Sequence, residues 1–245
     1  GATSAKQLPQ ELLIRGEGDP GRRCYPLALV MAAALSKGEA AERTLIGKVA
    51  NASLAPEERD THALLQILDE LRAFPMADFG HKAGNASLEQ AVQRLDAKDS
   101  TGALMLNTDS HSVLLVKGGV AGESVYRFYD PNFGVFGFDT VQSLRQGLER
   151  FFDLPGLAAL YGVEGSANAR FDLIALEGAR IAQKALLSNL RVADLLSSAP
   201  VIGGKEIATW QHHAALRARA LSENARLGRS LAELDGKGWA RQFEQ

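Results

Sequence analysis

The chain has 245 residues, of which 46% are hydrophobic, and a formal net charge of −2 at pH 7. This composition supplies the apolar side chains of a packed core and excludes an intrinsically disordered protein. The near-neutral charge gives no reason to expect a nucleic acid as a partner. The single cysteine excludes an internal disulfide framework and a cysteine-rich metal site. No apolar stretch approaches the roughly 18 residues of a membrane-spanning helix.

The first 38 residues predict two helices separated by a turn-rich stretch. The chain starts with GATS and carries neither an initiator methionine nor the pattern of a signal peptide, so we expect a processed or excised piece of a longer protein. A short helix is expected around residues 9–16. A second helix is expected to begin at Pro26, which suits the first helical position, and to stop at Gly38. Cys24 would then lie one or two residues before a helix N-terminus.

The remaining elements predict an α+β protein with helices first, a sheet in the middle and helices after it. Segments rich in β-branched and aromatic residues, bounded by Gly, Asp, Asn and Pro, are typical of an antiparallel meander. The predicted helices are 39–51, 56–73, 87–97, 140–152 and 205–235, with further helical segments over 179–197. The predicted strands are 102–108, 111–119, 124–130, 133–139 and 170–178.

Three residues far apart in the sequence together suggest nucleophilic catalysis. A hairpin turn centred between Val120 and Ala121 would place His111 opposite Asp130, with Cβ atoms about 4.5–5.5 Å apart. The carboxylate could then orient the imidazole as a general base, and a helix N-terminus beside that imidazole would lower the pKa of the Cys24 thiol. A bulge in the long hairpin loop would shift this register.

Each of these residues also has a purely structural explanation. Cys24 could be a small core residue, His111 a histidine at a strand end, and Asp130 a turn residue in Asp-Pro-Asn. Their order and the expected pairing favour the catalytic interpretation of the three together. His62 and His81 have no comparable context and are expected to be structural. The neighbouring His212 and His213 point in different directions on a helix, and we expect no metal site.

The segments GRRCYP, DSHSVLLVK and YRFYDPNFGVFGF resemble the Cys, His and Asp motifs of YopT-type cysteine peptidases. More narrowly, Arg-Cys-Tyr resembles the Arg-Cys-Asp/Tyr signature of effector domains related to the makes-caterpillars-floppy toxin. The resemblance covers roughly residues 20–140. It implies a papain-like cysteine protease fold in which Cys24 is the nucleophile, His111 the general base and Asp130 the orienting acid. Residues 1–200 would form this catalytic domain, and residues 201–245 a C-terminal helical extension.

The sequence departs from the papain-like pattern at the oxyanion hole. Such enzymes place a glutamine a few residues before the cysteine, whereas the nearest upstream glutamine here is Gln10. The backbone N–H of Cys24 is one expected donor, and Asn107 is a weak candidate for the second. Arg23 and Tyr25 match the flanks of the signature, and their expected roles are an ion pair and packing.

By resemblance, the expected function is that of a bacterial toxin or effector peptidase, secreted or delivered into the host cell cytosol. It would cleave itself or a host protein, and the family resemblance extends to a small GTPase as a host substrate or activator. No cofactor is expected. The same triad could instead serve a glutamine deamidase or an acyltransferase, with arylamine acetyltransferases ranked lower because their cysteine context differs.

A non-catalytic host-protein-binding domain is the alternative from a different class. Under that hypothesis Cys24 is a core residue and its replacement by alanine leaves the protein's effect intact. The basic residues of the predicted helix 205–235 more often form a solvated face than a binding site. They are Arg217, Arg219, Arg226 and Arg229.

Overall fold

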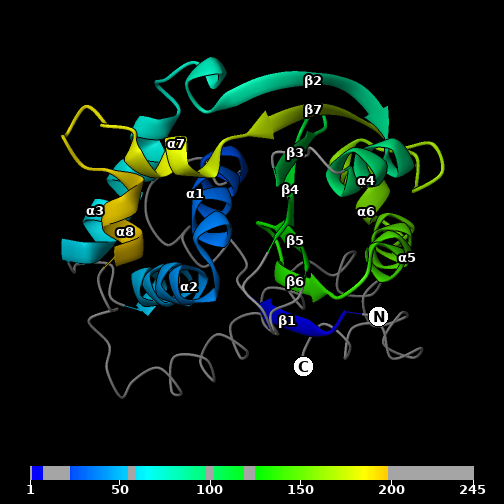
Figure 1. The fold of residues 1–245 in the computed structure, drawn as a ribbon, viewed down its shortest axis with the longest axis horizontal. Coiled ribbons are helices and arrows are strands. Elements are labelled where there is room, and N and C mark those ends of the chain that lie inside the picture. Colours follow the sequence, from blue (N-terminus) through cyan, green and yellow to red (C-terminus); the bar gives the residue numbers. More distant parts are fainter. Residues whose placement is uncertain (1, 8–22, 55–58, 98–101, 119–124, 198–245) are drawn as a thin grey trace.

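The architecture is a seven-stranded antiparallel sheet with helices on both faces (Figure 1). The computed structural model describes residues 2–7, 23–54, 59–97, 102–118 and 125–197. The strand order is β1-β6-β5-β4-β3-β7-β2, so the meander from β3 to β6 forms the middle of the sheet. The strands are β1 (Ser4–Gln7), β2 (Gly80–Ser87), β3 (Ala103–Asn107), β4 (Ser112–Lys117), β5 (Tyr126–Asp130), β6 (Gly134–Phe138) and β7 (Arg170–Leu176).

The central strands are buried on both faces because their successive side chains enter two different cores. In β4, Leu114 and Val116 join one hydrophobic cluster, whereas Val113 and Leu115 join the other. The first cluster contains helices α1 (Cys24–Lys37), α2 (Glu39–Leu54), α3 (Arg59–Leu71), α7 (Gly178–Gln183) and α8 (Val192–Ser197). The second contains α4 (Leu88–Asp96), α5 (Val141–Phe152) and α6 (Leu157–Tyr161). The sheet is therefore the middle of three layers.

Helix α1 runs through the centre of the first helical layer (Figure 1). Its residues from Pro26 to Leu35 are all buried, which explains why the sequence there is apolar on every side. Helix α7 crosses α1 closely at Gly178, where an added Cβ would lie 2.2 Å from Ser36 Oγ and 3.0 Å from the Ala32 carbonyl oxygen. This packing fixes α1, and hence Cys24 at its N-terminus, against the sheet.

The α+β prediction is confirmed, including N-terminal helices on a central antiparallel sheet and further helices after it. The four strands of the predicted meander are present and pair in sequence order. The helical segments expected over 179–197 are confirmed as α7 and α8, which are separated by a loop in which Ala185 pairs with Arg191. Strands β1 and β2 were not anticipated. The helices expected at 9–16 and 205–235 lie outside the described residues.

Within the described part of the chain, no helix combines the length and the apolar character needed to cross a membrane.

Candidate active site

Cys24 is the first residue of α1, and not a residue before it as the sequence suggested. The first helical hydrogen bond runs from the Leu27 amide to the Arg23 carbonyl oxygen, at 3.0 Å. Pro26 is tolerated at the third helical position because the amides of the first turn have no partner within the helix. Because the helix begins two residues earlier than expected, the thiol lies beside the amides of this first turn, and the Tyr25 amide donates a hydrogen bond to it.

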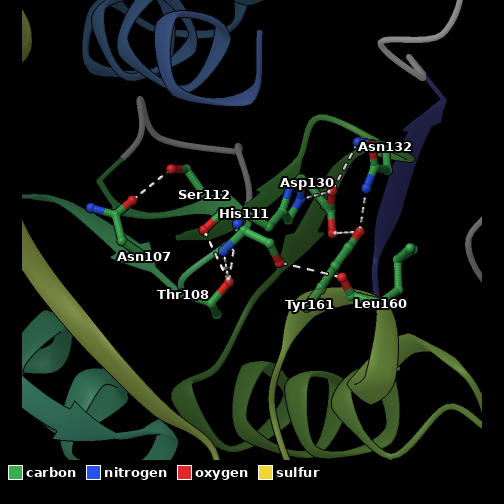
Figure 2. A network of polar contacts seen from close by, with 9 residues as sticks. Asn107, Thr108, His111, Ser112, Asp130, Asn132, Leu160 and Tyr161 are labelled. Carbon is green, nitrogen blue, oxygen red and sulfur yellow. Dashed lines mark hydrogen bonds and ion pairs between the residues drawn. The ribbon is translucent and has the colours of Figure 1, made fainter. Parts of the chain in front are cut away.

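His111 is held by a tight turn between β3 and β4. The Thr108 amide donates to the His111 carbonyl oxygen at 2.9 Å, and the His111 amide donates to Thr108 Oγ1 at 3.1 Å (Figure 2). Ser110, within the same turn, donates its hydroxyl to the Leu160 carbonyl oxygen at 3.3 Å. These contacts fix the backbone of His111 independently of the contacts that its side chain makes.

The His111 side chain bonds Asp130, the last residue of β5. The distance between His111 Nε2 and Asp130 Oδ1 is 2.9 Å, and the carboxylate is completely buried (Figure 2). Because Nε2 is engaged by Asp130, Nδ1 is the nitrogen left to exchange a proton with the Cys24 thiol. A hydrogen bond joins the Cys24 and His111 side chains. The structure thus brings the three predicted residues together.

The hairpin register differs from the prediction by two residues. Leu114 pairs with Tyr129 and Leu115 with Phe128, a register that places Val113 opposite Asp130 and leaves His111 beyond the paired strand. A shift of two residues keeps every side chain on the same face of the sheet. His111 therefore reaches Asp130 along the diagonal, where side chains on one face can still meet. The expected contact is confirmed although the expected register is wrong.

The electrostatics of the pair favour a thiolate facing an imidazolium. Burial alone would lower the pKa of His111, but the charge and hydrogen bond of Asp130, together with those of Cys24, raise it to about 9. Burial alone would raise the pKa of Cys24. The hydrogen bond and charge of His111 and the amides of Ser112 and Tyr25 outweigh it and lower that pKa. At neutral pH His111 is therefore protonated, and it faces a thiol that ionises more readily than an ordinary one.

Two residues that the sequence did not single out complete the network around Asp130. The Asn132 amide donates to Asp130 Oδ1 at 2.8 Å, and the Tyr161 hydroxyl donates to Asp130 Oδ2 at 2.7 Å. Asn132 belongs to the quoted Asp-Pro-Asn segment, where the Phe133 amide also closes a turn on the Asp130 carbonyl oxygen. The turn explanation of Asp130 and its place in the network are both correct. Nothing local in the sequence distinguishes Tyr161.

The weaker site candidates, Asn107, Tyr25 and Arg23, make the following contacts. Asn107 accepts a hydrogen bond from the Ser112 hydroxyl at 2.6 Å, and in Figure 2 it lies on the far side of Ser112 from His111. Tyr25 packs against the first hydrophobic cluster, as expected. Arg23 caps α1 through its backbone, without a hydrogen bond from its side chain to the helix end. None of these contacts is made to His111 or Asp130.

The remaining histidines of the chain do not form a cluster in the described residues. His62 on α3 and His81 on β2 are both exposed, and His212 and His213 lie outside the described residues. Among the residues that the structure describes, no group of three or more His, Cys, Asp or Glu side chains is arranged to hold a metal ion.

A helix that begins at a cysteine and packs on a sheet carrying a buried His–Asp pair defines the papain-like class, and the fold is that of a cysteine protease-like domain. The family model of the Mcf1 protease effector domain matches residues 1–203, and the chain belongs to this family. The resemblance to effector domains related to the makes-caterpillars-floppy toxin is thereby confirmed. The chain is an effector domain of a toxin family.

A solved structure shows the same fold at low sequence identity. It is PatoxP, described as a cysteine protease-like domain of the Photorhabdus asymbiotica toxin PaTox. The two chains share 15% sequence identity and superpose with a TM-score of 0.59, over 80% of this chain and 60% of that one. No curated protein matches the chain.

Proposed function

We propose that this domain is a cysteine endopeptidase in which Cys24, His111 and Asp130 form the catalytic triad. The observation that carries the proposal is the position of His111, whose imidazole bonds the Cys24 thiol on one side and the buried Asp130 carboxylate on the other. A nucleophile, a base and an orienting acid in this order are the parts that acyl transfer by a thiol needs. Membership of a protease effector family supports the same conclusion.

The reaction follows from the protonation states. The Cys24 thiolate attacks the scissile carbonyl carbon, and the charge that develops on the carbonyl oxygen is directed to the backbone amide of Cys24 at the helix N-terminus. His111, as the imidazolium, gives its Nδ1 proton to the leaving amine, and a thioester remains on Cys24. Neutral His111 then removes a proton from water, which attacks the thioester and releases the acid. The thiolate and the imidazolium are restored.

The substrate side of the proposal rests on the family. A toxin effector domain acts after delivery into a host cell, so we propose a host protein as substrate, with self-cleavage as a second reaction. A small GTPase is one host protein to test as substrate or activator. Residues 1–200 would carry the catalysis, and residues 201–245 would be an extension of it.

Reactivity of the thiol tests the triad without knowledge of the substrate. Iodoacetamide near pH 6 should label Cys24 much faster than an ordinary free thiol, and His111→Ala should abolish the difference. Slow labelling of the unmodified domain would show that Cys24 is a core residue and would contradict the proposal that the domain is a cysteine peptidase. Asp96→Asn is a suitable control because that carboxylate is bonded to Tyr126 and Lys117, away from the triad.

A second experiment identifies the reaction. Host-cell lysate is incubated with the domain or with its Cys24→Ala variant, and new protein N-termini and changed side chains are compared by mass spectrometry. New N-termini that depend on Cys24 support the peptidase. Conversion of a glutamine to glutamate without cleavage would show that the domain is a deamidase and contradict the peptidase. The mass of the domain itself, followed in the same samples, reports self-cleavage.

A further inference from the structure

The Tyr161 side chain contacts both members of the His–Asp pair. Its ring stacks on the His111 imidazole with a centroid separation of 4.1 Å and an interplanar angle of 23°. Its hydroxyl donates to Asp130 Oδ2 at 2.7 Å (Figure 2). Tyr161 is the last residue of α6 and is only 2% exposed. The preceding residue, Leu160, provides the carbonyl oxygen that accepts the Ser110 hydroxyl, so α6 also holds the turn that carries His111.

The direction of the Tyr161 hydroxyl proton is fixed by its neighbours. A tyrosine hydroxyl has one proton to donate, and it can accept as well. The Asn132 side-chain amide donates to this oxygen at 2.7 Å, which leaves the hydroxyl proton for Asp130 Oδ2. The other carboxylate oxygen, Oδ1, receives His111 Nε2 and the Asn132 backbone amide. Every contact made to this buried carboxylate is therefore a donor, as an ionised acid requires.

We propose that Tyr161 is the positioning residue of the triad, holding the Asp130 carboxylate through its hydroxyl and the plane of the His111 imidazole through its ring. The inference rests on the proposed catalytic triad and extends it by one residue. Without the hydroxyl, Oδ2 loses its donor among the described residues, and the carboxylate can rotate away from His111. Without the ring, the imidazole loses the surface that fixes its rotation about the Cβ–Cγ bond. Tyr161 takes no part in making or breaking bonds and acts through the pair that it contacts.

Loss of the hydroxyl has a predictable electrostatic sign. A donated hydrogen bond stabilises the charge of a carboxylate and so weakens its hold on a neighbouring proton. In Tyr161→Phe the ring remains stacked while Asp130 attracts the His111 proton more strongly, which moves the pKa of His111 upward. His111 then becomes a weaker acid toward the leaving amine and a less available base for the second step, so we expect about a tenfold lower kcat with an unchanged KM.

The pH dependence of Cys24 alkylation tests this without a peptide substrate. In the unmodified domain the rate should show an acidic inflection where the thiol ionises and an alkaline inflection where His111 loses its proton. Tyr161→Phe should shift the alkaline inflection to higher pH and leave labelling fast near neutral pH. Tyr161→Leu, which also removes the ring, should slow neutral labelling by about tenfold or more, since the imidazole is no longer held in place.

Tyr126→Phe is the matched control. Tyr126 lies in the same hydrophobic cluster as Tyr161 and donates its hydroxyl to the carboxylate of Asp96, at the opposite end of β5 from Asp130. Loss of the Tyr126 hydroxyl should lower the melting temperature, as we also expect for Tyr161→Phe, but it should leave both inflections in place. A Tyr161→Phe profile that superposes on that of the unmodified domain overturns the positioning role. Slow labelling of the unmodified domain would instead overturn the triad itself, so the two failures are distinguishable.

Discussion

Replacing Asp130 with asparagine keeps the size of the side chain but removes the charge that faces His111. The pKa of His111 is raised to about 9 from an ordinary 6.5, and Asp130 is the foremost cause of the increase. That difference corresponds to a net preference of about 3 kcal/mol for the imidazolium, because one pKa unit is worth about 1.4 kcal/mol. Burial acts against this preference, and Cys24 contributes part of it. In Asp130→Asn, burial acts unopposed by this carboxylate, and neutral imidazole beside neutral thiol becomes the stable form.

The consequence is measurable as thiol reactivity. Alkylation of Cys24 in Asp130→Asn should be slower by about 100-fold near pH 6 to 7, and the difference should vanish at a pH where an ordinary thiol is ionised. The assay is the rate of iodoacetamide labelling followed by intact mass, on samples whose thermal unfolding shows that the variant is folded. Asp96→Asn serves as the control. Labelling of Asp130→Asn at the rate of the unmodified domain across this range would refute the ion-pair reasoning.

Two further variants test the electrostatics and the packing. A raised His111 pKa alone makes stability fall as pH rises from about 6.5 to about 9, whereas a lowered Cys24 pKa makes stability rise with pH up to the ordinary thiol value of 9.0, so the two slopes oppose each other below pH 9. Chemical unfolding of Cys24→Ala should therefore reveal a steeper decline than in the unmodified domain, of up to about 1.4 kcal/mol per pH unit, which starts near pH 6.5 and ends below pH 9 because Cys24 no longer helps to raise the His111 pKa; parallel curves for the two proteins would contradict the pair. Gly178→Ala should destabilise the domain by about 1–3 kcal/mol, because the new Cβ would lie 2.2 Å from Ser36 Oγ. Thermal unfolding measures this, Ser36→Gly in the same chain should recover part of the loss, and an unchanged melting temperature in Gly178→Ala would show that α7 moves aside freely.

The buried strands of the meander are the part of the fold that the sequence predicts well. β3 to β6 consist mainly of apolar and aromatic residues between turn residues, because both faces of these strands enter a core. Strand β2 cannot be predicted from its residue composition in this way. Its sequence, GHKAGNAS, has low strand propensity, and it forms an edge strand through its pairing with β7. Gly84, at φ 86°, lies at a bulge in that pairing, where the register shifts.

The candidate site divides in the same way. Cys24, His111 and Asp130 could be inferred because each follows from a local pattern: a helix start, a strand start and an Asp-Pro-Asn turn. The hairpin register could not be fixed, since the chain between Lys117 and Tyr126 is long enough to allow more than one pairing on the same face. Tyr161 could not be inferred at all. Its contact with Asp130 spans 31 residues and depends on the packing of α6 against the sheet, which no local pattern encodes.

The network around Asp130 crosses all three layers of the domain. Cys24 comes from the helical layer on one face, His111 and Asp130 from the sheet, and Tyr161 from the layer on the other face. Loosening either core therefore misaligns the pair before the chain unfolds, and the thiol then returns to its ordinary acidity. The reactivity of Cys24 therefore reports on the tertiary packing of the domain. Under mild denaturant, we expect the fast alkylation of Cys24 to be lost while helices and strands still persist.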